Sequence, residues 1–303
     1  MDGYAIAFEA GKLDYQLDGE IAAGSNQQFQ LKPGHAVRIF TGAAVPPGAD
    51  TILVQEKSAI HQGQLQVNDL QLKKGDHVRT VGSEIEKGTK ALSKGHLLNA
   101  ASIGFLAGMG ISSVTAYPQP RVTILVTGNE LQLPGNPLEY GQVYESNSFT
   151  LKACLSQLHI RVAAVMQSGD NPLQLQAMLE QALETSDLIL ITGGVSVGDY
   201  DFTKDAFASC GVKQVFHKIR QKPGKPLLFG TRDEKAVFGL PGNPASVLTC
   251  FYEYVIPAIG RMMHSAKSIE SKRVALEHDH QKPAALTHFS KALYNGQTVS
   301  LQA

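Results

Sequence analysis

One stretch near the middle of the chain, residues 187–201, constrains the fold more than any other. It reads DLILITGGVSVGDYD, so the apolar run from Leu188 to Ile191 leads directly into a glycine-rich turn. An unbroken apolar run of this length is typical of a strand that is covered on both faces. Glycine adopts positive φ readily and lets the backbone approach a ligand, so the turn predicts an anion-binding loop. The next helical pattern starts near Thr203, which places a helix N-terminus close to this turn.

Two carboxylates, Asp199 and Asp201, stand in the same turn. Carboxylates repel phosphate unless a cation lies between them, so their presence predicts a metal-assisted phosphate or oxyanion site. Ser196 lies between Gly194 and Gly198, in a pattern that superficially matches the Gly-x-Ser-x-Gly nucleophile elbow. The double glycine before the serine favours a phosphate cradle over a hydrolase nucleophile.

Length and composition exclude several classes of protein. The 303 residues predict two to four domains, and the formal net charge of 0 does not indicate a broad basic surface for nucleic acid. No apolar run approaches the roughly 18 residues that span a bilayer, and the first residues do not resemble a secretory signal. We therefore expect no nucleic-acid partner and no membrane partner. Cys154, Cys210 and Cys250 are widely spaced, and we interpret them as buried core thiols in a reducing cytoplasm.

The first part of the chain, residues 5–82, is rich in turns and short apolar runs, which predicts a small β domain. The expected strands include residues 35–40, 51–54 and 64–67. A helix is expected over residues 99–110, with Asn99 as its N-cap and Gly110 as its C-terminal stop.

From Arg121 onward, predicted strands alternate with predicted helices. We expect strands at residues 121–127, 160–166, 188–192, 212–217, 227–230 and 236–240, and helices at residues 147–158, 170–185, 203–209 and 245–259. This alternation predicts a parallel sheet with helices on both faces. Ligands of such sheets bind at the carboxyl ends of the strands.

Three more polar clusters lie close to these predicted strands. Thr127-Gly-Asn-Glu130 ends the first strand, and Leu240-Pro-Gly-Asn-Pro-Ala-Ser246 leads into an apolar helix. Lys222-Pro-Gly-Lys-Pro226 forms a compact cationic patch on a proline-stiffened loop. A plain turn or a solvated loop is the alternative interpretation of each cluster. The histidines lack the spacing of zinc ligands, so we expect no zinc site.

Taken together, these motifs resemble the molybdopterin molybdenumtransferases, the family that includes the gephyrin E domain. The resemblance covers nearly the whole chain. The stretches that carry it are Met1–Ala5, Arg38–Asp50 with Val54–Glu56, Thr127–Leu131, Tyr144–Asn147, Gly193–Asp201, Lys222–Pro226 and Leu240–Pro244. Each motif alone is of moderate specificity, whereas their occurrence in the family's order is strongly specific.

The resemblance implies a multidomain α/β protein. We expect residues 1–6 and 83–117 to form part of a linking and dimerisation domain of α+β type, and residues 7–82 to form a small β-rich domain. Residues 118–262 would be a three-layer α/β molybdopterin-binding domain with a parallel-rich sheet, and residues 263–303 the start of a C-terminal β domain. The family's N-terminal helical segment and most of its C-terminal domain are then expected to lie outside this sequence.

The resemblance also implies an activity. Members of the family insert molybdate into adenylylated molybdopterin with a divalent cation such as Mg²⁺, and release AMP and the molybdenum cofactor. It further implies a cytoplasmic homodimer, with a molybdopterin adenylyltransferase as a possible partner. Two alternatives stay open: a molybdopterin adenylyltransferase, which would lack residues 1–117, and a non-catalytic molybdopterin-binding fragment.

Matched motif by motif, the resemblance assigns site residues. The catalytic residues would be Asp2, Glu130 and Asp201, and the metal ligands Asp199, Asp201 and Glu84. The ligand-binding residues would be Thr41, Gly128, Gly193, Gly194, Ser196, Gly198, Lys222, Lys225, Pro241, Gly242, Asn243 and Pro244. The chain departs from the family pattern at Asn129 and at Glu84, where aspartate is usual, and we expect both departures to affect the metal geometry.

Overall fold

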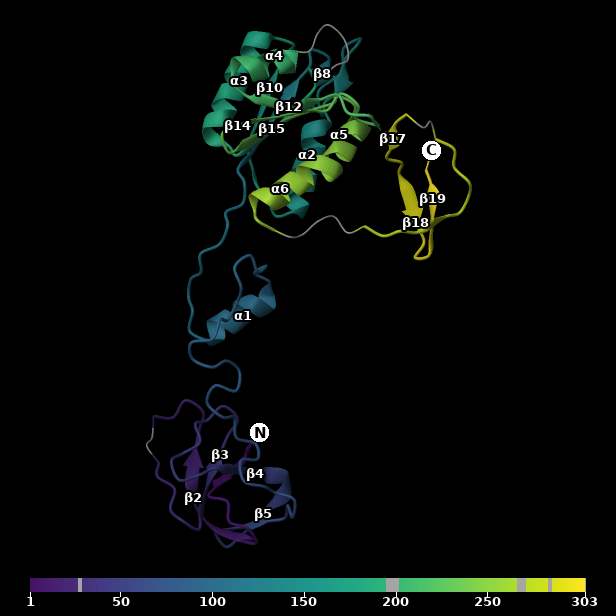
Figure 1. Ribbon diagram of the computed structural model, residues 1–303. Coiled ribbons are helices and arrows are strands. Elements are labelled where there is room, and N and C mark those ends of the chain that lie inside the picture. The colour runs from purple at the N-terminus through teal and green to yellow at the C-terminus, as the bar shows by residue number, and fades with distance from the viewer. Residues whose placement is uncertain (27–28, 195–201, 266–270, 283–284, 303) are drawn as a thin grey trace. The chain divides into compact units, whose positions relative to one another are not determined.

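The computed structural model describes residues 1–26, 29–194, 202–265, 271–282 and 285–302. The chain divides into two compact units, Met1–Ala91 and Leu92–Ala303, and each contains its own sheet (Figure 1).

The first unit holds a six-stranded sheet with the strand order β4-β1-β3-β2-β6-β5. Its strands are β1 (Gly3–Ile6), β2 (Asp14–Ile21), β3 (His35–Ile39), β4 (Thr51–Val54), β5 (Ser58–His61) and β6 (Gln64–Val67), and a 3₁₀ turn, Gln55–Lys57, follows β4. Successive side chains of β1 enter different apolar clusters, because Tyr4 and Ile6 join one cluster and Ala5 joins the other. The predicted β-rich domain therefore forms around a sheet with apolar residues on both faces.

Close packing between β1 and β4 explains the glycine in the first motif. A Cβ at Gly3 would lie 2.2 Å from the carbonyl oxygen of Leu53, so no larger residue fits there. Strand β1 thus pairs with strands of the β-rich region, although residues 1–6 were expected to belong with residues 83–117. The linking domain itself stays a prediction.

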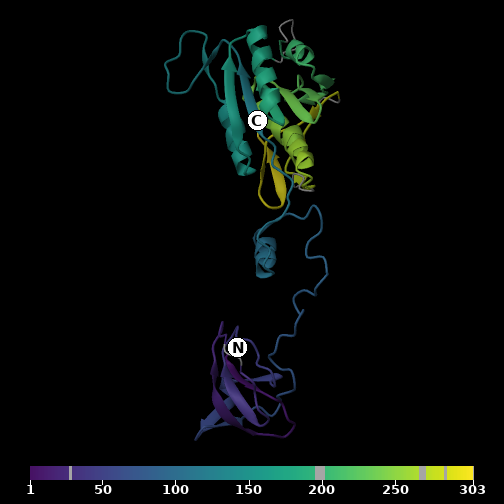
Figure 2. The same ribbon diagram turned by 90° about the vertical axis from the view of Figure 1, so that its left-hand side faces the viewer.

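The second unit contains the three-layer α/β body (Figures 1 and 2). Its main sheet has the order β10-β7-β11-β15-β14-β12. The strands of this sheet are β7 (Val122–Thr127), β10 (Val162–Ser168), β11 (Leu188–Thr192), β12 (Lys213–His217), β14 (Leu228–Arg232) and β15 (Lys235–Leu240). The helices of the unit are α1 (Ala100–Gly108), α2 (Asn147–Gln157), α3 (Pro172–Thr185), α4 (Phe202–Ser209), α5 (Pro244–Cys250) and α6 (Ile256–Met262).

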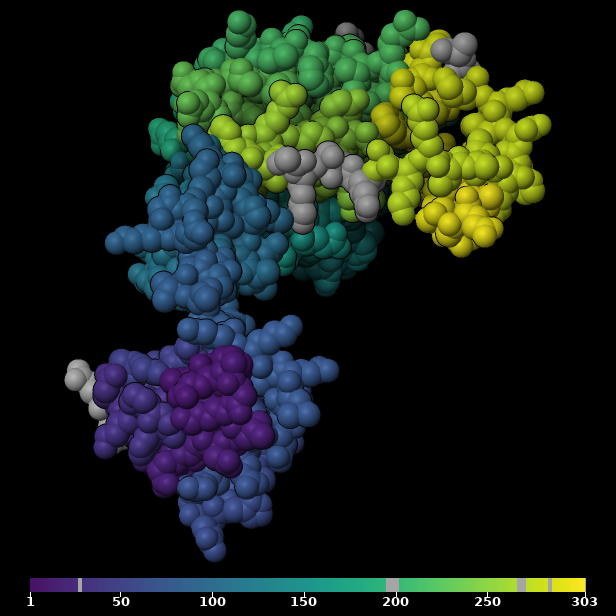
Figure 3. Space-filling model, turned by 60° about the horizontal axis from the view of Figure 1, so that its bottom comes forward, coloured from purple at the N-terminus to yellow at the C-terminus, as the bar shows by residue number. Residues whose placement is uncertain are grey.

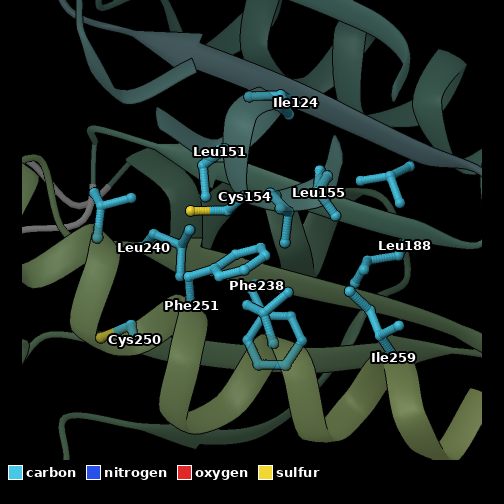
Figure 4. Packing of buried hydrophobic residues seen from close by; sticks show 14 of the residues in the cluster. Ile124, Leu151, Cys154, Leu155, Leu188, Phe238, Leu240, Cys250, Phe251 and Ile259 are labelled. Atoms are coloured by element: carbon cyan, nitrogen blue, oxygen red, sulfur yellow. The ribbon is translucent and has the colours of Figure 1, made fainter. Parts of the chain in front are cut away.

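Helices cover both faces of this sheet. On one face, Ile124 and Leu190 pack in a cluster with residues of α2, α5 and α6, which Figure 4 shows from close by. On the other face, Leu125 and Ile191 pack against α3 and α4. This alternation along β7 and β11 is the expected result of burying both faces of a strand.

The sheet is parallel-rich, as expected, but its β14 and β12 side contains antiparallel pairings. Strands β14 and β15 are antiparallel, because only Asp233 and Glu234 separate them and a two-residue loop cannot make a parallel crossover. As a result, Leu228 at the start of β14 lies opposite Gly239 near the end of β15. The loop 218–227 between β12 and β14 therefore lies at the same edge of the sheet as the carboxyl ends of the parallel strands.

The single helix expected over residues 245–259 is also corrected. Helix α5 ends at Cys250, a π-helical turn spans Phe251–Val255, and α6 begins at Ile256. Such π turns are rare and frequently occur at functional sites. The apolar pattern alone predicted a helix but not this change in hydrogen bonding.

Short strands complete the second unit. Strands β8 (Leu131–Gln132) and β9 (Val143–Tyr144) pair with each other, β13 (Gln221–Lys222) pairs with β17 (Thr287–His288), and β16 (Ala275–Leu276), β18 (Ala292–Tyr294) and β19 (Thr298–Leu301) form a small sheet. All three cysteines are free and buried, which confirms the prediction of core thiols. Within the described residues, no helix is both long and apolar enough to cross a membrane.

Candidate functional site

The parallel strands end level with one another. Thr127 of β7 lies opposite Ser168 of β10, and Thr192 of β11 lies opposite Val126 and Leu240. The turns that follow these strands therefore gather at the edge of the sheet where the parallel strands end, which we call the strand-end edge. They contain residues 128–130, 169–171, 193–194 and 241–243.

The glycines after β11 are required by close contacts with β7. Gly193 has φ of 84°, and a Cβ there would lie 2.1 Å from the carbonyl oxygen of Thr127. Gly194 has φ of 64°, and a Cβ there would lie 2.9 Å from Thr203 Oγ1 and 3.0 Å from Thr127 Oγ1. The predicted positive φ is thus confirmed at both glycines, and two threonine hydroxyls converge on the second.

Several buried polar atoms at this edge have no partner. The hydroxyls of Thr127, Thr192 and Thr203 and the side-chain oxygen of Asn147 are buried, and they make no hydrogen bond within the described part of the chain. A buried polar group without a partner costs about 1–3 kcal/mol, so native proteins contain few of them. Their concentration here indicates a place for a bound polar ligand or ordered water.

Asn147 is a candidate site residue that sequence reasoning did not select. Its Nδ2 donates to the carbonyl oxygen of Gly242 at 2.9 Å, which ties the start of α2 to the turn after β15. A Cβ at Gly242 would lie 4.0 Å from Gly193 Cα, so the turns after β11 and β15 lie side by side. The only signal in the sequence was the Tyr144–Asn147 motif, because the contact joins residues far apart in the chain.

The turn after β15 starts a helix. The side-chain oxygen of Asn243 accepts a hydrogen bond from Ala245 N at 2.9 Å and caps α5, and Pro244 occupies the first turn of the helix. Pro241 is buried, whereas Gly242, Asn243 and Pro244 are exposed. The side chain of Asn243 thus has a structural function, and its predicted contact with a ligand would use its remaining groups.

The turn after β7 presents a carboxylate. Gly128 has φ of 147°, and a Cβ there would lie 2.7 Å from Oε2 of the exposed Glu130, so the carboxylate folds back over the glycine. Beside it, Asp170 N donates to Asn129 Oδ1 at 3.0 Å, and Asn129 N donates to Asp170 Oδ2 at 3.3 Å. An aspartate at position 129 would place a second negative charge next to Asp170, and asparagine avoids this repulsion.

The predicted cationic loop reaches the same edge because β12 and β14 are antiparallel. Lys222 and Lys225 are exposed, and neither forms an ion pair with another described residue. Gly224 between them has φ of 91°, and a Cβ there would lie 2.6 Å from Cys250 Sγ. Burial raises the pKa of the Cys250 thiol to about 12, so this side chain is neutral packing rather than a nucleophile.

In the first unit, the structure joins two residues that the resemblance assigned separately. The Asp2 carboxylate accepts hydrogen bonds from Thr41 N and Thr41 Oγ1, both at 2.9 Å. These bonds hold the pKa of Asp2 below its ordinary value. Both residues are exposed. Figure 3 shows the N-terminal residues, in purple, at the surface that faces the viewer. Glu84 is also exposed and forms an ion pair with Arg79.

Two of the predicted metal ligands and two of the predicted ligand-binding residues fall in a part of the chain that the structure does not describe. Ser196, Gly198, Asp199 and Asp201 lie outside the described residues. Among the residues that are described, no group of three His, Cys, Asp or Glu side chains comes together as a metal site.

The fold and the site define a class of protein: an α/β domain with unpartnered buried polar groups at its strand ends, preceded in the chain by a β-rich unit. Comparisons with known families agree with both parts. Residues 1–110 match the MoeA N-terminal region (domain I and II), and residues 123–261 match a probable molybdopterin binding domain.

Individual relatives give the same result. The molybdopterin molybdenumtransferases of Nostoc sp. and Haemophilus influenzae are each 37% identical to this chain, over 89% and 86% of its length. The chain spans 64% and 65% of the lengths of those two relatives. A molybdopterin biosynthesis MoeA protein from Pyrococcus horikoshii has a similar crystal structure, with a TM-score of 0.81, 30% identity, and coverage of 100% of this chain and 77% of its own. The chain belongs to the molybdopterin molybdenumtransferase family, as its motifs indicated.

Proposed function

We propose that this chain inserts molybdate into adenylylated molybdopterin and releases AMP and the molybdenum cofactor. The observation that carries this proposal is the group of unpartnered buried hydroxyls at the strand-end edge, beside the loop with Lys222 and Lys225. Backbone N–H groups and hydroxyls can contact phosphate oxygens, and the ammonium groups offset the negative charge of the ligand. The same edge therefore suits a ligand that carries phosphate groups.

Further roles follow from the family pattern alone. We infer that Asp2, Glu130 and Asp201 take part in the chemistry, and that Asp199, Asp201 and Glu84 hold Mg²⁺ or another divalent cation. A cation at such carboxylates would offset the charge of a phosphate bound next to them.

On the same family pattern, we propose a homodimer that works in the cytoplasm and receives its substrate from a molybdopterin adenylyltransferase. Sedimentation of the chain tests the dimer directly. A monomer that still releases AMP would reject it.

The match of residues 1–110 to the MoeA N-terminal region favours this activity over that of a molybdopterin adenylyltransferase, which would share only the α/β domain. Incubation with adenylylated molybdopterin, molybdate and Mg²⁺ should yield AMP. Formation of adenylylated molybdopterin from molybdopterin and ATP would instead support the adenylyltransferase. Binding without either product would support a non-catalytic fragment.

The role of Asp201 can be tested in the same assay. Asp201→Asn should lower AMP release by about tenfold or more, while the melting temperature stays within a few degrees, because the change conserves the size and polarity of the side chain. Unchanged AMP release would remove Asp201 from the chemistry.

A further inference from the structure

The π turn places a tyrosine hydroxyl against the residue before the lysine loop. Tyr254 lies in this turn and donates a hydrogen bond to Oε1 of Gln221. Gln221 is 2% exposed and immediately precedes Lys222. Neither Tyr254 nor Gln221 is among the residues that the family pattern assigns to the site.

The Gln221 side chain continues the contact into the loop. Its Nε2 donates to the carbonyl oxygens of Pro223 at 3.0 Å and Gly224 at 3.4 Å. The opposite orientation of the amide would point its oxygen at two carbonyl oxygens, so these acceptors fix the side chain. With Nε2 facing the loop, Oε1 is directed to the Tyr254 hydroxyl, and both ends of the amide are used.

Main-chain bonds close the same loop. Ile219 N donates to the carbonyl oxygen of Lys225 at 2.9 Å, and Leu227 N donates to that of Gly224 at 3.2 Å. Since Lys222 and Lys225 have no ion-pair partner in the described ranges, their direction depends on the loop backbone. The carbonyls that Gln221 holds belong to the two residues between these lysines.

We propose that Tyr254 and Gln221 are positioning residues, which hold the loop so that Lys222 and Lys225 face one anionic ligand at the strand-end edge. The inference rests on the proposed function in one respect, the binding of that ligand by the lysines. The π turn then has a specific use, because it supplies the hydroxyl that anchors Gln221 on the side away from the loop.

A first test needs no ligand. Tyr254→Phe removes only the hydroxyl, and amide hydrogen exchange at Ile219 and Leu227 should become about fivefold faster, the effect of losing one net hydrogen bond. Amides of strand β11 should keep their rates. Tyr252→Phe is the matched control, because Tyr252 lies in the same turn, whereas the hydrogen bond to Gln221 among the described residues comes from Tyr254. Unchanged exchange at Ile219 and Leu227 would overturn the inference.

A second test separates positioning from general stability. Affinity for adenylylated molybdopterin should fall about fivefold in Tyr254→Phe, the equivalent of one hydrogen bond. In a chain that already carries Lys222→Gln and Lys225→Gln, the same change should cause no further loss, because the groups that it positions are gone. Additive losses would reject the positioning role.

The two tests also distinguish this inference from the proposed function. The lysine variants could bind the ligand normally while Tyr254→Phe still accelerates amide exchange. That result would reject the proposal that the lysines bind the ligand, and with it the positioning role of Tyr254 and Gln221. If the lysine variants lose affinity but Tyr254→Phe does not, the binding role stands and the positioning role alone is rejected.

Discussion

In the first unit the polar groups assigned to the site already have partners, whereas at the edge of the α/β body several do not. The exposed Asp2 carboxylate is bonded to Thr41, and the exposed Glu84 is paired with Arg79. The hydroxyls of Thr127 and Thr203 are buried without partners among the described residues. Exposed groups with partners have little effect on the folding free energy of the ligand-free protein, whereas buried groups without partners destabilise it.

The difference indicates where the ligand contributes most. A ligand that satisfies the buried hydroxyls would stabilise the second unit, since binding to the native state always favours that state. The first unit gains less from such contacts because its groups are already satisfied. The variants below test this contrast, beginning with the largest expected effect.

The largest effect is expected from Gly193→Ala, which would place a Cβ 2.1 Å from the carbonyl oxygen of Thr127. We expect the second unit to lose at least about 3 kcal/mol of unfolding free energy, measured by urea denaturation. Gly141→Ala is the matched control, because Gly141 has a similar φ of 86° but no atom within 4 Å of its Cβ position. The control should lose about 1–2 kcal/mol through backbone strain alone. Equal losses would mean that the glycine turn is not under steric constraint.

A smaller effect is expected from two threonines of β7, whose replacement by valine should change the unfolding free energy in different directions. Thr123 Oγ1 and Ser186 Oγ are hydrogen-bonded at 2.7 Å in the core, so Thr123→Val leaves a buried hydroxyl alone and should destabilise by about 1–2 kcal/mol. Thr127→Val removes an unpartnered hydroxyl and should leave the unfolding free energy unchanged or raise it. It should weaken ligand binding. A loss of stability in Thr127→Val equal to that in Thr123→Val would contradict the contrast.

The smallest effect concerns the pKa of Asp2. Hydrogen bonds from Thr41 depress the folded-state pKa, so the stability they contribute is present above the unfolded pKa and is lost as the pH falls through the folded pKa, below about pH 4. Thr41→Val should raise the pKa of Asp2 toward its ordinary value in a carbon-13 NMR titration. The pKa of Asp69, which Lys57 lowers, should stay the same. The bond from the backbone N–H of residue 41 stays in this variant, so the shift should be partial. No change at Asp2 would show that the Thr41 hydroxyl does not contribute to the depressed pKa.

Much of the α/β body could be predicted because its local signals agree with its packing. Strand β11 has the expected limits, residues 188–192. Before this body in the chain, Asn99 caps helix α1 as expected, because its side chain accepts a hydrogen bond from Ser102 N. Strand β10 runs over Val162–Ser168 instead of residues 160–166, since its half-buried alternating pattern defines its ends less sharply than a continuous apolar run.

The features that were missed depend on contacts between distant residues. The reversal of β14 follows from a two-residue loop whose importance is clear only when the strand pairing is known. The π turn is associated with the contact between Tyr254 and Gln221, 33 positions earlier in the chain. Asn147 becomes a candidate site residue only through its hydrogen bond to Gly242, 95 positions away. No local periodicity contains this information.

Ligand affinity tests the central claim, that the strand-end edge with its lysine loop binds the anionic substrate. Adenylylated molybdopterin would be titrated calorimetrically, over a series of salt concentrations, into the wild type, a Lys222→Gln/Lys225→Gln variant and a Lys213→Gln control. Lys213 is exposed and lies at the opposite edge of the sheet, where it pairs with Thr231. We predict that the double variant loses about tenfold or more in affinity at low salt, that the difference narrows as salt screens the charges, and that the control binds as wild type does. Equal affinity of the double variant and the wild type at low salt would contradict the account.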